Sequence, residues 1–339
     1  MNITKRFLSK IQSESFLIGI LYLISLLSLY NDDTDNTKRG RPYIYPTTVM
    51  LRCLVVRIWM RIPSNNALHY YFSINTKYNN KVMKACGLHN LPDRRTFDRR
   101  FKTIPVKDMI NTMGRRIVSE GFADSTVVAV DSSLIHAKNR RVWHKSAMKN
   151  NMVPRSGIDT EARWGFSRNK GWVFGYKLHL SCSSTSKLIV PLSVDFSTAN
   201  VSDNQMYCNL IESLSNETQY VVSDLGYDDH KLYDYSKHRC ITLVCPIRRC
   251  QHTKGERLKQ IRFYKSDSGQ QIYQNRSVSV EPLFWCIKDT FGISVMPVSG
   301  FVNARSYVLL CVLVYQLAVY YNCITGVNNP RHIKRMLGN

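Results

Sequence analysis

Acidic residues are scarce in this sequence. Its 339 residues include 24 Asp and Glu against 47 Lys and Arg, which gives a formal net charge of +23 at pH 7. A positive field of this size attracts polyanions, and Lys and Arg that neutralise phosphates supply most of the non-specific affinity of proteins for DNA. Nucleic acid is therefore the expected partner, with an anionic membrane surface as the competing one.

A compact disulfide framework is lacking as well. The ten cysteines are scattered along the chain, which in a protein of this length indicates reduced intracellular thiols and a cytoplasmic location. Cys240, Cys245 and Cys250, with His238 and His252 on either side, form one local group that zinc could occupy. Zinc sites usually have tighter pairs such as C-x2-C, so core or loop cysteines are the expectation there.

No hydrophobic run is both long and uninterrupted. The stretch 16–29 follows a basic start, but it is short and no small-residue cleavage site follows it, as expected for a buried helix. The longer stretch 306–324 is interrupted by Gln316 and several tyrosines. Both are expected to be core helices, so a membrane partner is not expected; a membrane span is the alternative for the second.

The hydrophobic pattern changes near residue 120. We expect a helical N-terminal DNA-binding region at 1–120, a mixed α/β domain at 121–325 with a basic loop at 138–171, and a C-terminal tail at 326–339. Strand-like runs lie at 126–131, 174–182, 187–196, 219–224 and 240–245. Helical patterns cover about 1–30, 47–61, 63–72, 93–102, 203–215, 228–237, 280–290 and 304–322.

Basic residues concentrate in two segments. Between Lys38 and Arg116 there are 17 Lys and Arg and 3 acids, and between Leu134 and Leu180 there are 10 and 2. The first segment contains the expected helix at 93–102, which fits a helix-turn-helix type module or, alternatively, a solvated helix that covers the core. The arginines of this helix are the candidate DNA contacts: Arg94, Arg95, Arg99 and Arg100.

The second basic segment is the loop at 138–171. Its candidate DNA contacts are Lys138, Arg140 and Arg141, and two tryptophans lie among its basic residues. Basic residues interleaved with aromatic ones suit contact with the DNA backbone and stacking on bases. A disordered loop is the alternative.

Two acids follow valine-rich, buried-type strands. Asp131 ends the run 127–130, and Asp224 ends the run 220–223. An unpaired buried charge is costly, so a carboxylate at such a strand end is better suited to holding a divalent cation. Two such ions, roughly 3.5–4 Å apart, can activate the nucleophile and stabilise the leaving oxygen of a phosphodiester. Glu281, which opens an amphipathic stretch, is a third candidate.

Each of these acids could instead cap a turn or a helix, since a carboxylate at a helix N-terminus is favoured by the helix dipole. The third position also has rivals. They are Asp228, Asp229 and Glu161.

Several segments resemble, in the same order, those of DDE transposases from prokaryotic insertion sequences. These segments are Val130-Asp131-Ser132-Ser133, Gly175-Tyr176-Lys177-Leu178-His179, Thr198-Ala199-Asn200-Val201-Ser202-Asp203 and Ser223-Asp224-Leu225-Gly226-Tyr227-Asp228. Upstream, Gly40-Arg41-Pro42 and the segment 86–97 resemble the N-terminal domain of the same family.

The family's Tyr-Arg-Glu-Lys signature has a counterpart in Tyr273, Arg276, Glu281 and Lys288. Glu281 and Lys288 are separated by the usual six residues, and Tyr273 and Arg276 by the usual two. Between Arg276 and Glu281 there are four residues, where the family usually has three.

The resemblance implies an α/β fold with an RNase H-like mixed sheet flanked by helices and preceded by a helical N-terminal domain. Asp131, Asp224 and Glu281 would be the catalytic residues and would bind two Mg²⁺ or Mn²⁺ ions. Lys288, Arg276 and Tyr273 would contact DNA. The expected partners are double-stranded terminal inverted repeats and target DNA, bound by a homodimer near the nucleoid.

The implied activity is metal-dependent cleavage of element ends followed by strand transfer. An RNase H-like nuclease or resolvase is one alternative. A catalytically inactive DNA-binding product of an element is the other.

Overall fold

The computed structural model describes residues 5–31, 43–168, 170–185, 188–248 and 255–337. The chain divides into two compact units, one formed by residues 1–113 and 309–339 and the other by 114–308. The Gly40-Arg41-Pro42 segment, Cys250 and His252 lie outside the described residues.

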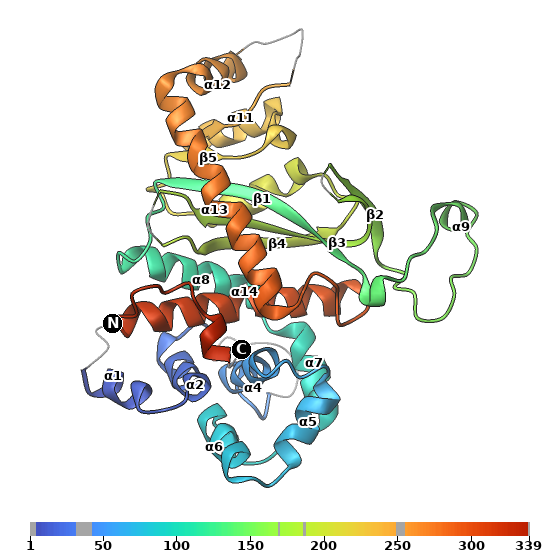
Figure 1. Cartoon of the computed structure of the whole chain (residues 1–339), viewed down its shortest axis with the longest axis vertical. Coiled ribbons are helices and arrows are strands. Elements are labelled where there is room, and N and C mark those ends of the chain that lie inside the picture. Colours follow the sequence, from blue (N-terminus) through green and yellow to red (C-terminus); the bar gives the residue numbers. More distant parts are fainter. Residues whose placement is uncertain (1–4, 32–42, 169, 186–187, 249–254, 338–339) are drawn as a thin grey trace. The chain divides into compact units, whose positions relative to one another are not determined.

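The first unit is helical throughout its described part (Figure 1). Two helices, α8 (Val106–Ser119) and α14 (Phe301–Ile324), contribute residues to both units. The remaining helices of the first unit are α1 (Lys5–Gln12), α2 (Phe16–Leu27), α4 (Thr47–Trp59), α5 (Asn65–Ser73), α6 (Lys77–Cys86), α7 (Arg94–Thr103) and the 3-10 turn η4 (Lys334–Leu337).

Side-chain caps fix where these helices begin. Ser64, Thr76 and Asp93 each accept a hydrogen bond from a backbone N–H in the first turn of α5, α6 and α7. Such caps satisfy donors that have no partner within the helix. Gly87 ends α6 in the left-handed conformation, with φ of 77°, which glycine adopts without a Cβ penalty.

The apolar stripe of α7 is buried as expected. Phe97 stacks on Phe72 of α5 with ring centroids 6.3 Å apart, and the buried guanidinium of Arg57 lies over the ring of Phe101 at 4.6 Å. Arg57 also donates to Asn65 Oδ1 at 2.8 Å, so its charge is buried with partners. The helix expected at 93–102 is confirmed.

The second unit contains a six-stranded mixed sheet with the strand order β2-β3-β1-β5-β6, and β4 also pairs with β3. The pairs β1–β3, β2–β3 and β3–β4 are antiparallel, whereas β5 runs parallel to both β1 and β6. The strands are β1 (Val127–His136), β2 (Arg163–Ser167), β3 (Gly171–Ser183), β4 (Pro191–Thr198), β5 (Tyr220–Val222) and β6 (Thr242–Val244).

Helices and 3-10 turns complete this unit, and the expected mixed α/β architecture is confirmed. Strand β2 lies within the segment 138–171 that was expected to be a loop, because its residues pair with the start of β3. The turns and helices are η1 (Lys138–Arg140), α9 (Lys145–Lys149), η2 (Asp203–Met206), α10 (Tyr207–Ile211), η3 (Leu225–Tyr227), α11 (His230–His238), α12 (Gly255–Lys265) and α13 (Asp267–Phe291).

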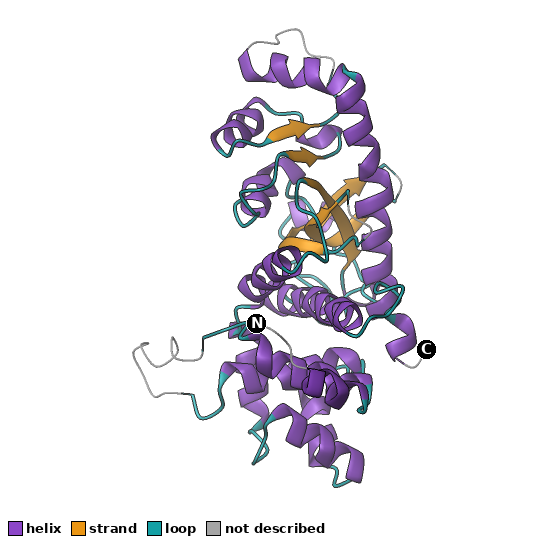
Figure 2. Ribbon diagram, turned by 90° about the vertical axis from the view of Figure 1, so that its left-hand side faces the viewer, coloured by secondary structure: helices purple, strands orange, loops and turns teal. Residues whose placement is uncertain are grey.

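Helix α13 runs along one face of the sheet (Figure 2). The Ser266 hydroxyl caps it by accepting from Gly269 N at 3.2 Å, and Gly292 ends it with φ of 65°. Its buried stripe includes Leu283, Phe284 and Ile287. Since α13 begins at Asp267, it is longer than the helix expected near 280–290 and brings Tyr273 and Arg276 onto the same element as Glu281.

Alternate side chains of β1 reach opposite faces of the sheet, as the strand geometry requires. Asp131 and Ser133 contact α13 through Arg276 and Lys288. Ser132, between them, contacts Asp203 of η2 on the other face. The strand therefore contributes side chains to two polar clusters, one on each face of the sheet.

By length and composition, α14 is the one helix among the described residues that could cross a membrane. Within its most apolar window, 89% of the residues are buried inside the structure. The interrupting Gln316 is buried and donates to Ile110 O at 3.1 Å.

The face of β3 that packs toward η2 and α10 carries a buried polar row. His179 is fully buried and its Nε2 is 2.8 Å from Ser197 Oγ. The Ser181 and Ser193 hydroxyls are 2.6 Å apart. Burial lowers the pKa of His179 to about 4; Lys177 acts in the same direction, while Asp203 and Asp195 oppose it.

We expect His179 to make the protein less stable in mild acid. Its pKa is about 4 in the folded chain and about 6.5 in the unfolded chain, so the unfolded chain binds more protons below about pH 6.5. The free energy of unfolding should therefore fall between pH 7 and 5, and His179→Gln should reduce that fall by about 2 kcal/mol. Urea denaturation at several pH values measures the difference; parallel curves for the two proteins would contradict it.

Candidate active site

Asp131 and Asp224 lie near each other because of the parallel ladder between β1 and β5. In this ladder Ala129 is opposite Val222. Asp131 and Asp224 each follow two residues later, so their side chains lie on the same face of neighbouring chain segments, which are roughly 4.8 Å apart. The expectation that a strand ends at Asp131 is wrong: β1 continues to His136, and Asp131 pairs with Leu180 of β3.

Both carboxylate oxygens of Asp131 have partners. Oδ1 accepts from Ser132 N at 2.8 Å, and Oδ2 accepts from Arg276 Nη2 at 2.7 Å. The side chain is 14% exposed. Burial raises the pKa of Asp131 to about 7; Arg276 and the Ser132 N–H act against this rise, whereas Asp224 and Asp203 add to it.

Asp224 is held by the tight turn that follows β5. Its Oδ1 accepts from Gly226 N at 2.8 Å and caps η3. A Cβ on residue 226 would lie 2.9 Å from this oxygen, so glycine allows the close approach. The next residue, Tyr227, is fully buried and its hydroxyl has no hydrogen-bond partner among the described residues. Burial raises the pKa of Tyr227, and Asp203, Asp131 and Asp224 raise it further.

Glu281 is joined to Asp131 through an arginine. Arg276 Nη1 lies 3.6 Å from Glu281 Oε1, while the same guanidinium contacts Asp131. The Glu281 side chain is 62% exposed. Within the described ranges, no group of three or more His, Cys, Asp or Glu side chains is close enough to hold a metal ion. Arg276 thus occupies the space between two of the three acids.

Lys288 is placed differently from its expected contact with a DNA phosphate. Its ammonium is buried against β1 and donates to Ser133 Oγ at 2.6 Å and to Leu134 O at 2.7 Å. Burial, together with the neighbouring Lys170, lowers the pKa of Lys288 to about 7. The face of α13 that packs on the sheet includes this position, which spacing from Glu281 alone did not indicate.

Tyr273, the other signature residue, is half-buried. Its ring packs edge-on against Tyr264 with centroids 5.3 Å apart. Burial raises the pKa of its hydroxyl, and the neighbouring Arg276 opposes that rise. The phenol therefore lies beside the guanidinium that connects the acids.

The three other candidates for the third catalytic acid form different contacts in the structure. Asp228 accepts two hydrogen bonds from the buried Arg257, at 2.6 and 2.9 Å. Asp229 caps α11 by accepting from Lys231 N, and Glu161 accepts from Phe301 N at the start of α14. These contacts account for each carboxylate without a metal ion.

Asp203 is a fourth acid of the site that sequence reasoning did not select. Its Oδ1 accepts from Ser132 Oγ and from Lys177 Nζ, both at 2.8 Å. Its charge also contributes to the raised pKa of Asp131. The segment Thr198–Asp203 carried the family resemblance, but nothing in it indicated that this turn lies against β1.

A second overlooked residue is Trp285, which is 66% exposed although it is a large aromatic side chain. It follows Glu281 by four residues on α13, so the two side chains are neighbours on the helix surface. The exposed position of a tryptophan next to an acid cannot be read from the amphipathic pattern alone, because that pattern favours burial of Trp.

The arginines of α7 do not share one environment. Arg94, Arg95 and Arg99 are exposed. Arg100, which was expected to contact DNA, is instead buried: its guanidinium lies 3.8 Å from the centroid of the Tyr43 ring and donates to the Thr47 hydroxyl. The helical period turns this one position toward α4, so its charge supports the core.

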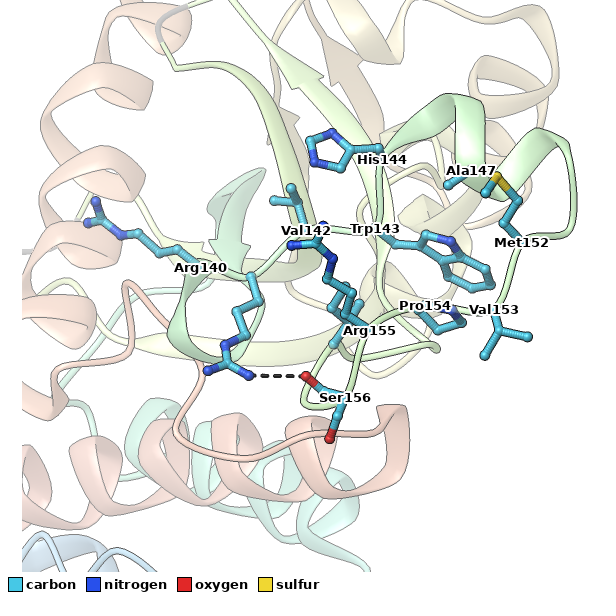
Figure 3. Close-up of a pocket in the computed structure, with 12 residues that line it drawn as sticks. Arg140, Val142, Trp143, His144, Ala147, Met152, Val153, Pro154, Arg155 and Ser156 are labelled. Atoms are coloured by element: carbon cyan, nitrogen blue, oxygen red, sulfur yellow. Dashed lines mark hydrogen bonds between the residues drawn. The ribbon is translucent and has the colours of Figure 1, made fainter.

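The basic segment after β1 extends away from the sheet and surrounds a cavity of about 730 Å³ (Figure 3). Arg140, Arg141, Trp143 and Arg155 are among the residues that line it. Arg141 Nη1 donates to Ser156 O at 3.1 Å, which closes one side of the loop.

Positive charge also gathers where β1 ends. Burial lowers the pKa of His136, and three cations then lower it further: Arg140, Lys170 and Lys288. They come from η1, from the residues before β3 and from α13. This convergence lies on the strand that carries Asp131.

The cysteine group does not form a metal site within the described residues. Cys245 is buried and lies 3.1 Å from the Tyr233 hydroxyl, whereas Cys240 is exposed. Cys250 is outside the described ranges.

Among solved structures, the chain is similar to the piggyBac transposase in a cryo-EM structure of its synaptic complex with hairpin DNA, with 10% sequence identity and a TM-score of 0.39 over 95% of this chain and 78% of that chain. None of the curated proteins matches this sequence. Residues 122–317, which are more than half of the chain and contain Asp131, Asp224 and Glu281, match the model of the transposase DDE domain, and the protein therefore belongs to this family.

Proposed function

We propose that this chain binds the ends of a prokaryotic insertion sequence, cuts them with the help of divalent metal ions, and transfers the freed 3′-OH ends to target DNA. The observation that carries the proposal is the position of Asp131 and Asp224, each two residues beyond the Ala129–Val222 pair of the β1–β5 ladder. Glu281 reaches the same site through Arg276. Acids gathered in this way repel one another, so the arrangement is costly unless it serves a cation.

The sheet supports an RNase H-like core within this proposal. If β2 is set aside as part of the segment 138–171, Asp131 lies on the first strand and Asp224 follows the fourth, with Glu281 on a later helix. This is the order that the family resemblance implies. The helices of residues 5–119 would then form the N-terminal DNA-binding region.

The residues present suit a magnesium or manganese site. All donors are carboxylate oxygens, which these hard cations prefer, and the Arg276 guanidinium already stands where a cation satisfies Asp131 and Glu281. Asp131, Asp224 and Glu281 would hold the ions, which is why Asp131 must be ionised for activity. When bound, two such ions would stabilise the attacking and leaving oxygens of the phosphodiester.

The DNA would be held by the basic surfaces that surround the acids. In the catalytic unit these are the loop residues Lys138, Arg140 and Arg141, with Tyr273 and Arg276 on α13. In the helical unit the exposed arginines of α7 would contact phosphates: Arg94, Arg95 and Arg99. Because each element has two ends, a homodimer would bring both ends together, and the net charge of +23 favours a place at the nucleoid.

We expect Asp131→Asn, Asp224→Asn and Glu281→Gln each to lower cleavage of element ends by at least about 100-fold, because each removes a charge that stabilises the transition state. DNA binding should stay within a few-fold of the wild type. The assay is cleavage of labelled terminal inverted repeats in Mg²⁺. Asp229→Asn is the matched control, since asparagine also caps a helix well and Asp229 serves α11.

Full cleavage by any of the three variants would overturn the assignment of the site. A preference for branched junctions over element ends would favour the nuclease or resolvase. Binding of ends without cleavage in Mg²⁺ or Mn²⁺ would favour an inactive element product.

The loop residues should contribute to DNA affinity through phosphate contacts. Replacing Arg140 and Arg141 together with alanine should reduce the slope of log affinity against log salt by about 2, since each phosphate contact contributes about 0.9. Fluorescence anisotropy at several salt concentrations measures the slope. Lys237→Ala removes an exposed lysine of α11 and serves as the control; equal slopes for the wild type and the double variant would refute a role in DNA binding.

Lys288 should act on stability and not on the salt dependence of DNA binding. Its pKa is about 7 in the folded chain and about 10.4 in the unfolded chain, so the unfolded chain binds more protons between these values. Relative to Lys288→Met, the wild type should therefore gain about 2 kcal/mol in the free energy of unfolding between pH 7.5 and 9.5.

Urea denaturation and anisotropy test the two parts of this prediction. Lys237→Met, which changes an exposed lysine, should show no pH-dependent difference. A salt slope reduced by about 1 in Lys288→Met would show instead that the ammonium contacts a phosphate.

A further inference from the structure

Arg276 is the residue on which the acids of the site converge. Its Nη2 is 2.7 Å from Asp131 Oδ2 and its Nη1 is 3.6 Å from Glu281 Oε1. The side chains of Arg276 and Asp131 are each 14% exposed, so water screens their contact only weakly. The Arg276 Nε atom is buried without a hydrogen-bond partner in the described part of the chain. Electrostatic attraction to the acids therefore holds the guanidinium in place, although not all of its N–H groups form hydrogen bonds.

The guanidinium of Arg276 stays protonated. Burial works against it, but Asp131, Tyr273, Asp224 and Glu281 more than compensate, so the pKa of Arg276 is raised. An arginine remains a cation at every pH at which the protein is folded. A fixed positive charge therefore lies among acids that would otherwise repel one another.

With this contact, both carboxylate oxygens of Asp131 accept a hydrogen bond. Oδ1 accepts from the backbone N–H of the next residue, Ser132, inside β1. Oδ2 faces α13, the helix that carries Glu281, and it is the oxygen that Arg276 occupies. Consistently, the described acids do not form a three-residue metal cluster while Arg276 lies between them.

We propose that Arg276 is the counter-ion of the acidic site in the metal-free protein, and that a divalent cation must displace its guanidinium from Asp131 in order to bind. This inference rests on the proposed function, because it takes Asp131 as a metal ligand. Arg276 is a positioning residue in this role: it keeps Asp131 and Glu281 near the site and makes metal binding a competition. The displaced guanidinium is then available to a DNA phosphate, the partner that the family resemblance gives it.

The test is the affinity of the full chain for Mn²⁺ in the absence of DNA, measured by electron paramagnetic resonance of the free ion. Arg276→Gln should bind Mn²⁺ roughly tenfold more tightly than the wild type, because the competing cation is gone. Arg116→Gln is the matched control. It removes the same charge from another arginine–carboxylate pair, with Glu120 just after α8 at 3.7 Å, and should change the affinity less than twofold.

A second measurement uses the wild type and so does not depend on the folding of a variant. The ¹⁵Nε resonance of Arg276, assigned by its loss in Arg276→Lys, should move toward the position of a solvated guanidinium as Mg²⁺ is added. In Asp131→Asn the same titration should leave it unchanged.

The outcomes separate the two proposals. Equal or weaker Mn²⁺ binding by Arg276→Gln, or an Arg276 resonance that does not respond to Mg²⁺ while Mn²⁺ binds, overturns the counter-ion role and leaves the proposed function standing. Absence of Mn²⁺ binding in the wild type overturns both. Tighter binding by Arg276→Gln but not by Arg116→Gln supports the inference.

Discussion

The parallel pairing of β1 with β5 is the constraint on which the rest of the site depends. Because Ala129 and Val222 share one register position, Asp131 and Asp224 lie on the same face, and a shift of one residue would turn one of them to the opposite face. The antiparallel pairing with β3 then places Ser132 opposite His179 and Leu134 opposite Lys177, which brings the polar row of β3 beneath the acids. Two ladders on one strand thereby determine which side chains meet.

Each face of β1 contacts charged side chains from a different element. On one face, α13 contributes Arg276 to Asp131 and Lys288 to Ser133 and Leu134. On the other, η2 contributes Asp203, which with Lys177 fixes the Ser132 hydroxyl. Lys288 and Asp203 are charged groups without an obvious reaction to perform, yet both bind the strand within three residues of Asp131. Their contacts hold the middle of β1, where Asp131 lies.

Charge in this protein is arranged on two scales. The whole chain carries a net charge of +23, which suits a polyanionic partner. Four of its few acids, Asp131, Asp203, Asp224 and Glu281, gather around β1, and the guanidinium of Arg276 contacts two of them. Cations from three elements also act on His136 at the end of the same strand.

The sequence by itself determined the features that depend on local pattern: the valine-rich runs that precede Asp131 and Asp224, the helix of 93–102 with its apolar stripe, and the spacing from Glu281 to Lys288. It did not determine the continuation of β1 to His136 or the presence of β2. It also did not determine the burial of Lys288 and Arg100 or the contact of Asp203 with Ser132, because these contacts join residues far apart in the chain. An exposed and a buried lysine look the same in a sequence. Only the tertiary structure decided which of these charged side chains face the solvent. Lys288 packs against β1 and Arg100 against α4, and the partners they find there offset the free energy of removing their charges from water.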